Sequence, residues 1–461
     1  MNRYSEATLQ EYPEPEKGPV AEPAPASPRI DPSLKRSLDQ HEHSDSVDGG
    51  VRAWLTVLGG FIALFCSFGQ LNAFGTFQAW YATHQLSHLH PSTISWIGSL
   101  QLWVFFFSGT FVGHAFDKHG PRPVLIVGSI VLVFSIMMTS LSTQYYQYML
   151  GQGILLSLGV GMMFYVSLAS IATHFTKYRA TAIGVASAGS GVGGTVFPII
   201  LPRLFHSLGF AWTVRVIGFI TLACCVLSLL LITRRAPDPR PFRTSDSWLD
   251  YPALRDIRFV LLAVGSALVC FGLFIPYFYI SSYAESFSDD LGPAVNRASP
   301  PHASISTPLA VLNAASVLGR TIPPLIADIL GPYNTLFPCA FLSGLFCFVL
   351  WLPAQQGAGF QPLVIAFTVL YGFFSGGVIA VVPPCVARIS DVTLIGTRMG
   401  MLYTVISIPS LLGGPAAGAL LAHDHGSYAD MIVVAGSAMV AGSLFILGSR
   451  FTVNRQLWEK V

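Results

Sequence analysis

Three polar side chains of one apolar segment, Asn313, Ser316 and Arg320, form the pattern best suited to binding a small molecule. Their spacing of three and four residues places all three on one face of a helix. Arg320 carries a guanidinium fork that matches a carboxylate, so this face predicts a contact with an organic anion. The alternative is that Arg320 makes an internal salt bridge or anchors one end of its helix.

Other apolar segments carry single polar side chains that are also candidate substrate-binding residues: Asn72, Thr76, Gln101, Gln152 and Tyr277. Asn72 and Thr76 are four residues apart and share a helical face. Tyr277 follows a proline that we expect to kink its helix, which would let the hydroxyl line a cavity. The alternative for each amide is a hydrogen bond between two helices, and for the aromatic residue it is packing.

A short motif, Asp-x-x-Gly-Pro, occurs at residues 117–121 and again at 328–332. The two copies are 211 residues apart, and each follows an apolar run. The repeat indicates that the chain has two related halves, and that each half carries this loop in the same place.

We expect this motif to control a change of conformation rather than to bind substrate. An aspartate near a helix end can accept hydrogen bonds from the N-terminus of a neighbouring helix. The predicted gating residues are Asp117, Gly120, Arg122, Asp328 and Gly331. The second copy lacks the bases Lys118 and Arg122 of the first, so we expect the stronger latch in the first half. The alternative is a plain turn whose positive charges anchor the chain.

The composition is that of a membrane protein. The 461 residues are 52% hydrophobic and 10% charged, whereas a soluble domain has about 25% charged residues. A membrane span needs about 20 mainly apolar residues. The segments that meet this length are 54–80, 92–115, 122–142, 147–171, 180–203, 213–233, 259–284, 304–327, 334–353, 362–387, 397–421 and 428–449.

The predicted fold class is therefore all-α integral membrane, with twelve transmembrane helices in two six-helix pseudo-symmetric halves. A charge at the bilayer centre costs about 2.5–3.5 kcal/mol, so Arg320 should face the bundle or a watery cavity. Two related halves with a site between them are a common plan of secondary transporters.

Lysine and arginine residues fall mainly in alternate loops, and the opposite loops carry Arg297 alone, with Arg203 and Arg215 near span ends. The positive-inside rule then places both termini in the cytoplasm. The predicted parts are a disordered N-terminal tail (1–50), an N-terminal half (51–233), a central cytoplasmic loop (234–258), a C-terminal half (259–449) and a C-terminal tail (450–461). We expect the plasma membrane, with a vacuolar or other internal membrane as the alternative.

Several classes of protein are disfavoured. A net charge of +2 gives no basis for nucleic-acid binding. The histidine pairs 41/43, 88/90 and 423/425 lack the further ligands of a metal site. There is no phosphate-binding glycine-rich loop and no nucleophile–base constellation, so we expect no cofactor and no enzymatic activity. The expected partners are a small organic anion or metabolite and the lipid bilayer, with the chain acting as a monomer. A non-transporting membrane sensor is the alternative from another class.

At this point the motifs resemble a known family. Asp117-x-x-Gly120-x-Arg122 resembles the loop 2–3 signature of the major facilitator superfamily. More narrowly, Asp48-Gly49-Gly50 and the run His-Phe-x-Lys-x-Arg-Ala-x-Ala-x-Gly at 174–184 resemble motifs of the monocarboxylate transporter family. The segments 72–78 and 313–320 are similar to the fungal branch of that family, and the resemblance extends from about residue 48 to about residue 450.

The resemblance implies a secondary active transporter for a small organic anion or related metabolite, with alternating access and proton coupling as one way to drive it. Two charged groups of the animal lactate carriers are replaced: Asn72 stands where they have a lysine, and Ser316 where they have an aspartate. Lactate and that mode of proton coupling are therefore not expected. Arg320 is retained, which keeps an anionic substrate, and efflux of a fungal secondary metabolite is the alternative.

Overall fold

The computed structural model describes residues 49–89, 91–234, 249–288, 307–355, 360–391, 394–424, 426–456 and 459. All regular secondary structure in these ranges is helical, and 12 helices or runs of helices are long and apolar enough to cross a membrane. Each predicted span overlaps one of them, which confirms the fold class. The described residues belong to the compact unit Val47–Val461.

Some predictions fall outside the described ranges. They concern nearly all of the tail at 1–50, most of the loop at 234–258, Arg297, and Asp48 of the motif before the first span. They also concern one or both members of each histidine pair, namely His41, His43, His90 and His425. Within the ranges that the structure does describe, no group of three or more His, Cys, Asp and Glu side chains could hold a metal ion.

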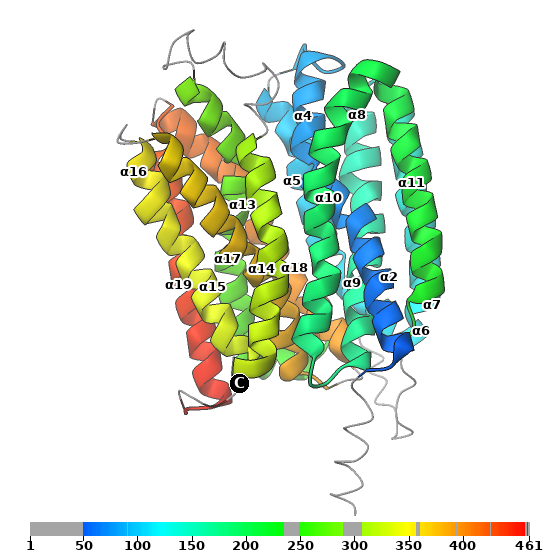
Figure 1. Ribbon diagram of the computed structural model, residues 1–461, viewed down its shortest axis with the longest axis vertical. Helices are drawn as coiled ribbons and strands as arrows, with labels where there is room; N and C mark the ends of the chain where they lie inside the picture. Colours follow the sequence, from blue (N-terminus) through cyan, green and yellow to red (C-terminus); the bar gives the residue numbers. More distant parts are fainter. Residues whose placement is uncertain are drawn as a thin grey trace, which may run out of the picture. The chain divides into compact units, whose positions relative to one another are not determined.

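The first six spans make up what we call the N-terminal half, drawn in blue to green in Figure 1. Its elements are α2 (Val51–Cys66), α3 (Phe68–Asn72), α4 (Phe74–Thr83), α5 (Pro91–Phe107), α6 (Gly109–His119), α7 (Pro121–Leu141), α8 (Tyr145–Tyr148), the π-helix η1 (Met149–Leu155), α9 (Leu156–His174), α10 (Arg179–Leu208) and α11 (Phe210–Leu231). The first span joins α2 to α4, the second α5 and α6, and the fourth α8, η1 and α9.

The last six spans make up the C-terminal half, and the short helix α12 (Tyr251–Arg255) precedes them. The elements are α13 (Ile257–Ser288), α14 (Thr307–Leu330), α15 (Pro332–Phe346), the π-helix η2 (Cys347–Trp351), α16 (Leu352–Gln355), α17 (Phe360–Arg388), α18 (Ile395–His423) and α19 (Ala429–Val453). The ninth span joins α15, η2 and α16.

The first span is interrupted twice, whereas the sequence predicts one continuous stretch. At the first break, the Ser67 hydroxyl donates to the carbonyl of Ala63 at 2.6 Å, and so competes with the backbone ladder. At the second, Ala73 leaves the helical conformation with φ −86° and ψ 1°. Asn72 is the last residue before this break. Broken helices within the membrane often form the binding site of a transporter.

The duplicated motif forms the same turn in both halves. Gly120 ends α6 with φ 78°, and Gly331 ends α14 with φ 102°, conformations that favour glycine over any other residue. The next residues, Pro121 and Pro332, begin α7 and α15, where the fixed φ of proline suits the first helical turn. The motif therefore produces a sharp reversal between consecutive spans.

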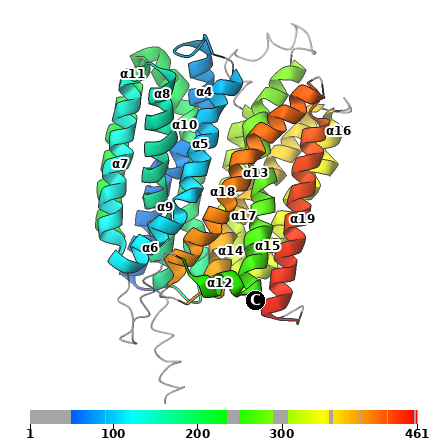
Figure 2. The same cartoon turned by 180° about the vertical axis from the view of Figure 1, so that it is seen from behind.

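The two halves contact each other mainly at two interfaces. At one, α10 packs against α14 (Figure 1), and at the other, α5 and α6 pack against α18, best seen in Figure 2. Glycines allow the close approach. A Cβ atom on Gly184 would lie 2.6 Å from the carbonyl oxygen of Arg320, and one on Gly113 would overlap the carbonyl oxygen of Gly396. Small residues let membrane helices approach this closely.

Large apolar side chains cover the outer surface of several spans. On α7 the exposed residues recur every three or four positions: Ile126, Ile130, Phe134, Met138 and Leu141. This spacing gives one continuous apolar stripe on that helix. Such a stripe is suited to contact with lipid chains rather than with water.

Candidate functional site

Arg320 is buried between α14 and α10, with a relative exposure of 1%. Its Nη1 donates a hydrogen bond to the Ser190 hydroxyl at 2.8 Å, while its Nε has no hydrogen-bond partner. In the described part of the chain, no carboxylate pairs with this guanidinium. The internal salt bridge considered above is therefore not formed among these residues. A buried, incompletely paired cation is costly, and a bound anion would satisfy it.

The other polar residues of the same helical face lie beside Arg320. Asn313 is fully buried; its amide nitrogen donates to the carbonyl of Leu309 at 3.1 Å, while its Oδ1 has no partner. The Ser316 hydroxyl donates to the carbonyl of Asn313 at 2.7 Å. The face thus combines one cation with one amide, and each has a buried polar atom without a hydrogen-bond partner, Nε of Arg320 and Oδ1 of Asn313.

Span five supplies the opposite wall of this site. A Cβ atom on Gly191 would lie 3.1 Å from Nη1 of Arg320, and one on Gly194 would lie 3.1 Å from Oδ1 of Asn313. The same atom on Gly194 would lie 3.1 Å from Cβ of Asn72. The glycines therefore bring residues of three spans together around the guanidinium.

Asn72 joins the site through Ser190. Its amide nitrogen lies 3.5 Å from the Ser190 carbonyl, and the hydroxyl of the same serine accepts from Arg320. Thr76 is half-buried one turn further along the first span. Ser190 was not among the predicted binding residues. The signal available was its position as a polar side chain within a glycine-rich run.

Span seven contributes Tyr277 to the group of polar residues near Arg320. Its hydroxyl lies 3.1 Å from the Ser375 hydroxyl of α17. Ser375 precedes Gly376, where a Cβ atom would lie 2.6 Å from the Ser316 carbonyl oxygen, so α17 links Tyr277 to the polar face of α14. The structure thus brings together five of the predicted residues: Asn72, Tyr277, Asn313, Ser316 and Arg320.

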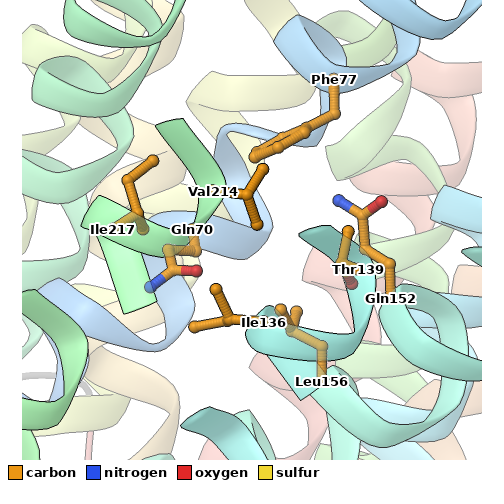
Figure 3. Close-up of a pocket in the computed structure, with 8 residues that line it drawn as sticks. All are labelled: Gln70, Phe77, Ile136, Thr139, Gln152, Leu156, Val214 and Ile217. Carbon is orange, nitrogen blue, oxygen red and sulfur yellow. The ribbon is translucent and has the colours of Figure 1, made fainter. Parts of the chain in front are cut away.

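The structure does not bring Gln152 to this group. Gln152 lies in η1 and accepts a hydrogen bond from the Tyr81 hydroxyl at 2.7 Å. It lines a small pocket inside the N-terminal half, shown in Figure 3. The pocket is lined by Gln70, Phe77, Ile136, Thr139, Gln152, Leu156, Val214 and Ile217. Gln70 is likewise bonded within this half, to Thr221 at 2.7 Å, so these amides connect helices. Gln101 on α5 is buried, and its Oε1 has no partner.

The predicted gating aspartates each reach across to the opposite half. The Asp117 carboxylate accepts from the backbone N–H groups of Gly396 at 3.2 Å and Thr397 at 2.7 Å, and from the Thr397 hydroxyl at 2.7 Å. These donors belong to the first turn of α18. A carboxylate at a helix N-terminus is stabilised by the exposed N–H groups and the helix dipole.

Asp328 makes the equivalent contact at the other interface. Its carboxylate accepts from the backbone N–H groups of Ala180 at 3.0 Å and Thr181 at 2.7 Å, in the first turn of α10. The donor residues also correspond between the halves. Gly396 and Thr397 of α18 each lie 216 residues after their counterparts in α10, Ala180 and Thr181. The duplicated motif therefore makes a duplicated contact between the halves.

The bases around the first motif differ from the prediction. Arg122 is exposed, whereas Arg234 at the end of span six donates to the carbonyl oxygens of Phe116 and Asp117 at 3.4 and 3.3 Å. Arg179 of α10 donates to the Ala387 carbonyl at 3.3 Å and so adds a further link between the halves. Neither arginine was predicted to take part, because such contacts depend on how the helices meet.

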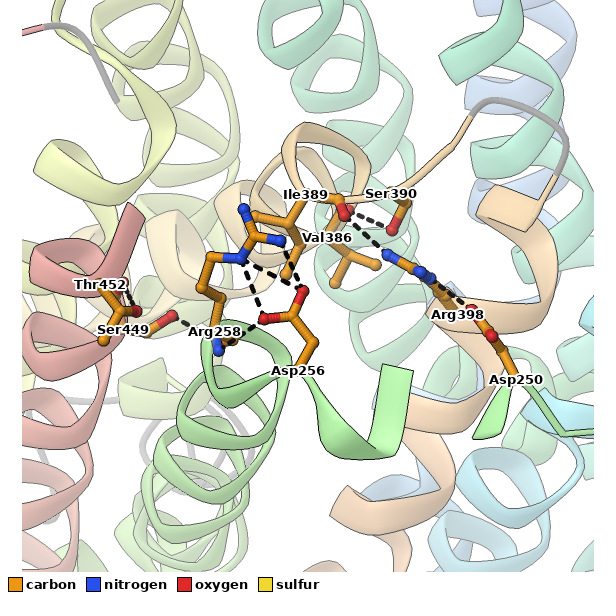
Figure 4. A network of polar contacts seen from close by, with 9 residues as sticks. All are labelled: Asp250, Asp256, Arg258, Val386, Ile389, Ser390, Arg398, Ser449 and Thr452. Carbon is orange, nitrogen blue, oxygen red and sulfur yellow. Dashed lines mark hydrogen bonds and ion pairs between the residues drawn. The ribbon is translucent and has the colours of Figure 1, made fainter. Parts of the chain in front are cut away.

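One ion pair lies at the start of α18 and a second at the start of α13, as Figure 4 shows. The buried Asp250 carboxylate accepts from Arg398 at 2.7 Å, and Arg398 also donates to the Ile389 carbonyl at 2.7 Å. Partial burial raises the pKa of Asp256, but hydrogen bonds from the side chain and backbone of Arg258 outweigh this and hold the pKa below its usual value. The Asp250–Arg398 pair holds the first turn of α18, to which Asp117 binds.

Twelve membrane-crossing helices in two related halves, with polar side chains buried where the halves meet, define a multi-pass membrane transporter. Residues 60–356 match the family model described as "Major Facilitator Superfamily", and the chain belongs to this family of transporters.

Similar proteins are fungal. The chain is 40% identical over 390 residues to "MFS-type transporter 1" of Ophiocordyceps sp., covering 84% of this chain and 83% of that protein. It is 38% identical to the aspyridones efflux protein apdF of Emericella nidulans (85% and 76% covered) and 37% identical to the agnestins efflux protein AgnL12 of Paecilomyces divaricatus (80% and 81%). Among solved structures, the E. coli fucose:proton symporter has a TM-score of 0.64 at 13% identity (86% and 98% covered).

Proposed function

We propose that this chain exports an organic anion, a fungal secondary metabolite or a related compound, by alternating access. The observation that carries the proposal is Arg320. It is a buried cation at the interface between the halves, with one hydroxyl partner and a free Nε. Asn313 and Asn72 offer further polar contacts beside it. An anionic group of the substrate would complete this set.

The direction of transport is inferred from the relatives. Two of them are named efflux proteins for aspyridones and agnestins, and we transfer only the direction and the general class of substrate. Uptake of a monocarboxylate is the second candidate, because the segment 313–320, which contains Arg320, resembles that of the monocarboxylate transporter family. Asn72 and Ser316 replace the two charged groups of the lactate carriers, so we rank this candidate second.

Alternating access would use the two aspartate contacts as a latch. In the described conformation both contacts are made, and the halves are closed together at the end that carries Asp117 and Asp328. We propose that this end faces the cytoplasm, as the charge distribution predicts, and that both termini lie on that side. We further propose that the transporter acts as a monomer in the plasma membrane and uses the proton gradient.

The test compares the metabolites inside and outside of host cells with and without the full-length protein. Export predicts that an acidic metabolite accumulates inside cells that lack the protein and outside cells that contain it. The Arg320→Gln variant, present in the membrane at equal amount, should behave like the absent protein. Higher internal levels in cells that contain the protein would support uptake instead. Collapse of the pH gradient should stop accumulation in vesicles, and continued uphill transport would contradict the proton coupling.

A further inference from the structure

The two interfaces between the halves carry the same latch but different side chains deeper in the membrane. The 211-residue offset that relates Asp117 to Asp328 also relates span two to span eight. It pairs the polar face of span eight with apolar or small residues of span two. Asn313, Ser316 and Arg320 correspond to Leu102, Phe105 and Gly109. The polar site thus belongs to the α10–α14 interface alone.

Aromatic rings occupy the other interface. Phe106 of α5 stacks on Tyr403 of α18, with ring centroids 5.8 Å apart and an interplanar angle of 18°. Phe274 of α13 lies 6.0 Å from Phe106, and Tyr165 of α9 lies 5.2 Å from Tyr403. Rings from both halves therefore form one cluster, which we call the aromatic wall: Phe106, Tyr165, Phe274 and Tyr403.

The aromatic wall is connected to the Arg320 site. The Phe274 and Tyr277 rings are 6.4 Å apart, and the Tyr277 hydroxyl lies 3.1 Å from the Ser375 hydroxyl, next to Gly376, which packs against Ser316. Arg320 and Tyr403 also lie at similar depths in the membrane, as measured from the latch. Arg320 precedes Asp328 by eight residues, about 12 Å along a helix, and Tyr403 follows Thr397 by six residues, about 9 Å. The cation and the wall thus lie at similar distances from the latch.

Tyr403 retains an unused hydrogen-bonding group. The Tyr165 hydroxyl donates to the Phe105 carbonyl at 2.9 Å, whereas the Tyr403 hydroxyl has no partner among the residues described. The glycine contact of this interface, Gly109 with Gly400, lies about one turn nearer the latch. Beyond it, the halves are joined by the stacked rings and by the Thr404 hydroxyl, which bonds the Phe107 carbonyl and the Thr110 hydroxyl. These rings must separate when the halves do, so they are not a permanent core.

We propose that the transported anion has a flat aromatic or conjugated body, which rests against Phe106 and Tyr403 while its acidic group binds Arg320. A ring pair that opens with the halves offers its faces to a planar molecule, and stacking favours such a partner over a saturated one. The Tyr403 hydroxyl would contact a polar substituent on the body. This inference rests on the proposed function, because it needs the anion at Arg320.

The test uses two sulfonates with the same head group and carbon number, naphthalene-2-sulfonate and its saturated form decahydronaphthalene-2-sulfonate. Both stay ionised, so neither crosses the bilayer unaided. Counterflow of each labelled probe into liposomes that contain the purified full-length chain reports recognition without a coupling gradient. We expect KM to be roughly three- to tenfold lower for the flat probe. Equal KM values for the unmodified protein would overturn the inference.

Variants of the aromatic wall distinguish whether its rings stack on the substrate or only close the interface between the halves. Tyr403→Leu and Phe106→Leu should remove the preference by raising KM for the flat probe alone, and Tyr403→Phe should keep it. Equal losses for both probes would assign the rings to closure and overturn the inference. Arg320→Gln should abolish counterflow of both probes. The assignment of the anion site would be refuted if Arg320→Gln left counterflow of both probes unchanged. It would also be refuted if the unmodified protein transported neither probe. A preference that survives in Arg320→Gln would contradict the proposed function and leave the wall as the recognition element.

Discussion

The Asp117 carboxylate binds the first turn of α18 through Thr397, whose backbone N–H and hydroxyl each donate to Oδ2 at 2.7 Å. Asp328 binds the first turn of α10 in the same way, through the backbone N–H groups of Ala180 and Thr181. The expectation of a stronger latch in the first half therefore gains a reason in the Thr397 hydroxyl. The donors to this carboxylate belong to Gly396 and Thr397, whereas Lys118 and Arg122 were the bases that motivated the expectation.

Asp117→Asn should slow transport without changing substrate preference. The amide keeps the shape of the side chain but loses the charge, and hydrogen bonds to a charged group contribute about 1.5–3 kcal/mol. We expect turnover to fall by about tenfold, or roughly 1.4 kcal/mol, with similar KM values for both sulfonate probes. Asp328→Asn should have a smaller effect. A change in preference between the probes would contradict a gating role.

Thr397→Val tests the hydroxyl of the latch, and Thr181→Val is its matched control. The Thr397 hydroxyl bonds Asp117, whereas the equivalent Thr181 hydroxyl is buried without a partner. Loss of the first should weaken the closed conformation by about 1 kcal/mol, roughly fivefold. Loss of the second should change little. The measurement is labelling of a cysteine placed under the latch, and equal labelling rates for both variants would refute the assignment.

Gly113→Ala should prevent closure of the α6–α18 interface. A Cβ atom there would overlap the carbonyl of Gly396, and neither backbone can yield without moving its helix. Gly75→Ala is the control, because nothing lies within 4 Å of its Cβ position. We expect Gly113→Ala to reduce transport at least tenfold, while Gly75→Ala retains it. Normal transport by Gly113→Ala would show that this contact is not needed in the cycle.

Asp250→Asn should lower stability far more than Asp256→Asn. The Asp250–Arg398 pair is largely buried, with side-chain exposures of 6% and 14%. Removing one partner of such a pair costs about 3–5 kcal/mol. Arg258, the partner of Asp256, is 45% exposed, and exposed pairs contribute at most about 1 kcal/mol. Thermal unfolding of the purified variants measures the difference, and equal shifts in Tm would contradict the buried clamp.

The spans and the duplicated loop could be predicted from the sequence because both depend on local properties. A span needs a run of apolar residues, and Gly120 and Gly331 each precede a proline that starts the next helix. Spacing along one helix also predicted the shared face of Asn313 and Arg320. These features do not depend on how distant segments meet.

The partners of these residues could not be predicted. Ser190 and Thr397 became important only because glycines bring the two halves into close contact. Gln152 shows the opposite case. As a polar side chain in the fourth span it was a candidate for substrate contact, with a hydrogen bond between helices as the alternative, and it bonds Tyr81 within one half. Position along a helix gives depth, whereas the direction a side chain faces depends on tertiary packing.

The most direct test of the account is counterflow of naphthalene-2-sulfonate by Arg320→Gln, with Arg320→Lys as the charge-retaining control. Glutamine can still donate to Ser190 but has no charge for an anion. We predict that Arg320→Gln loses at least about 100-fold in rate (roughly 2.7 kcal/mol), and that Arg320→Lys retains part of it. Both variants should reach the membrane in normal amount. An undiminished rate in Arg320→Gln would contradict the assignment of Arg320 as the anion-binding residue.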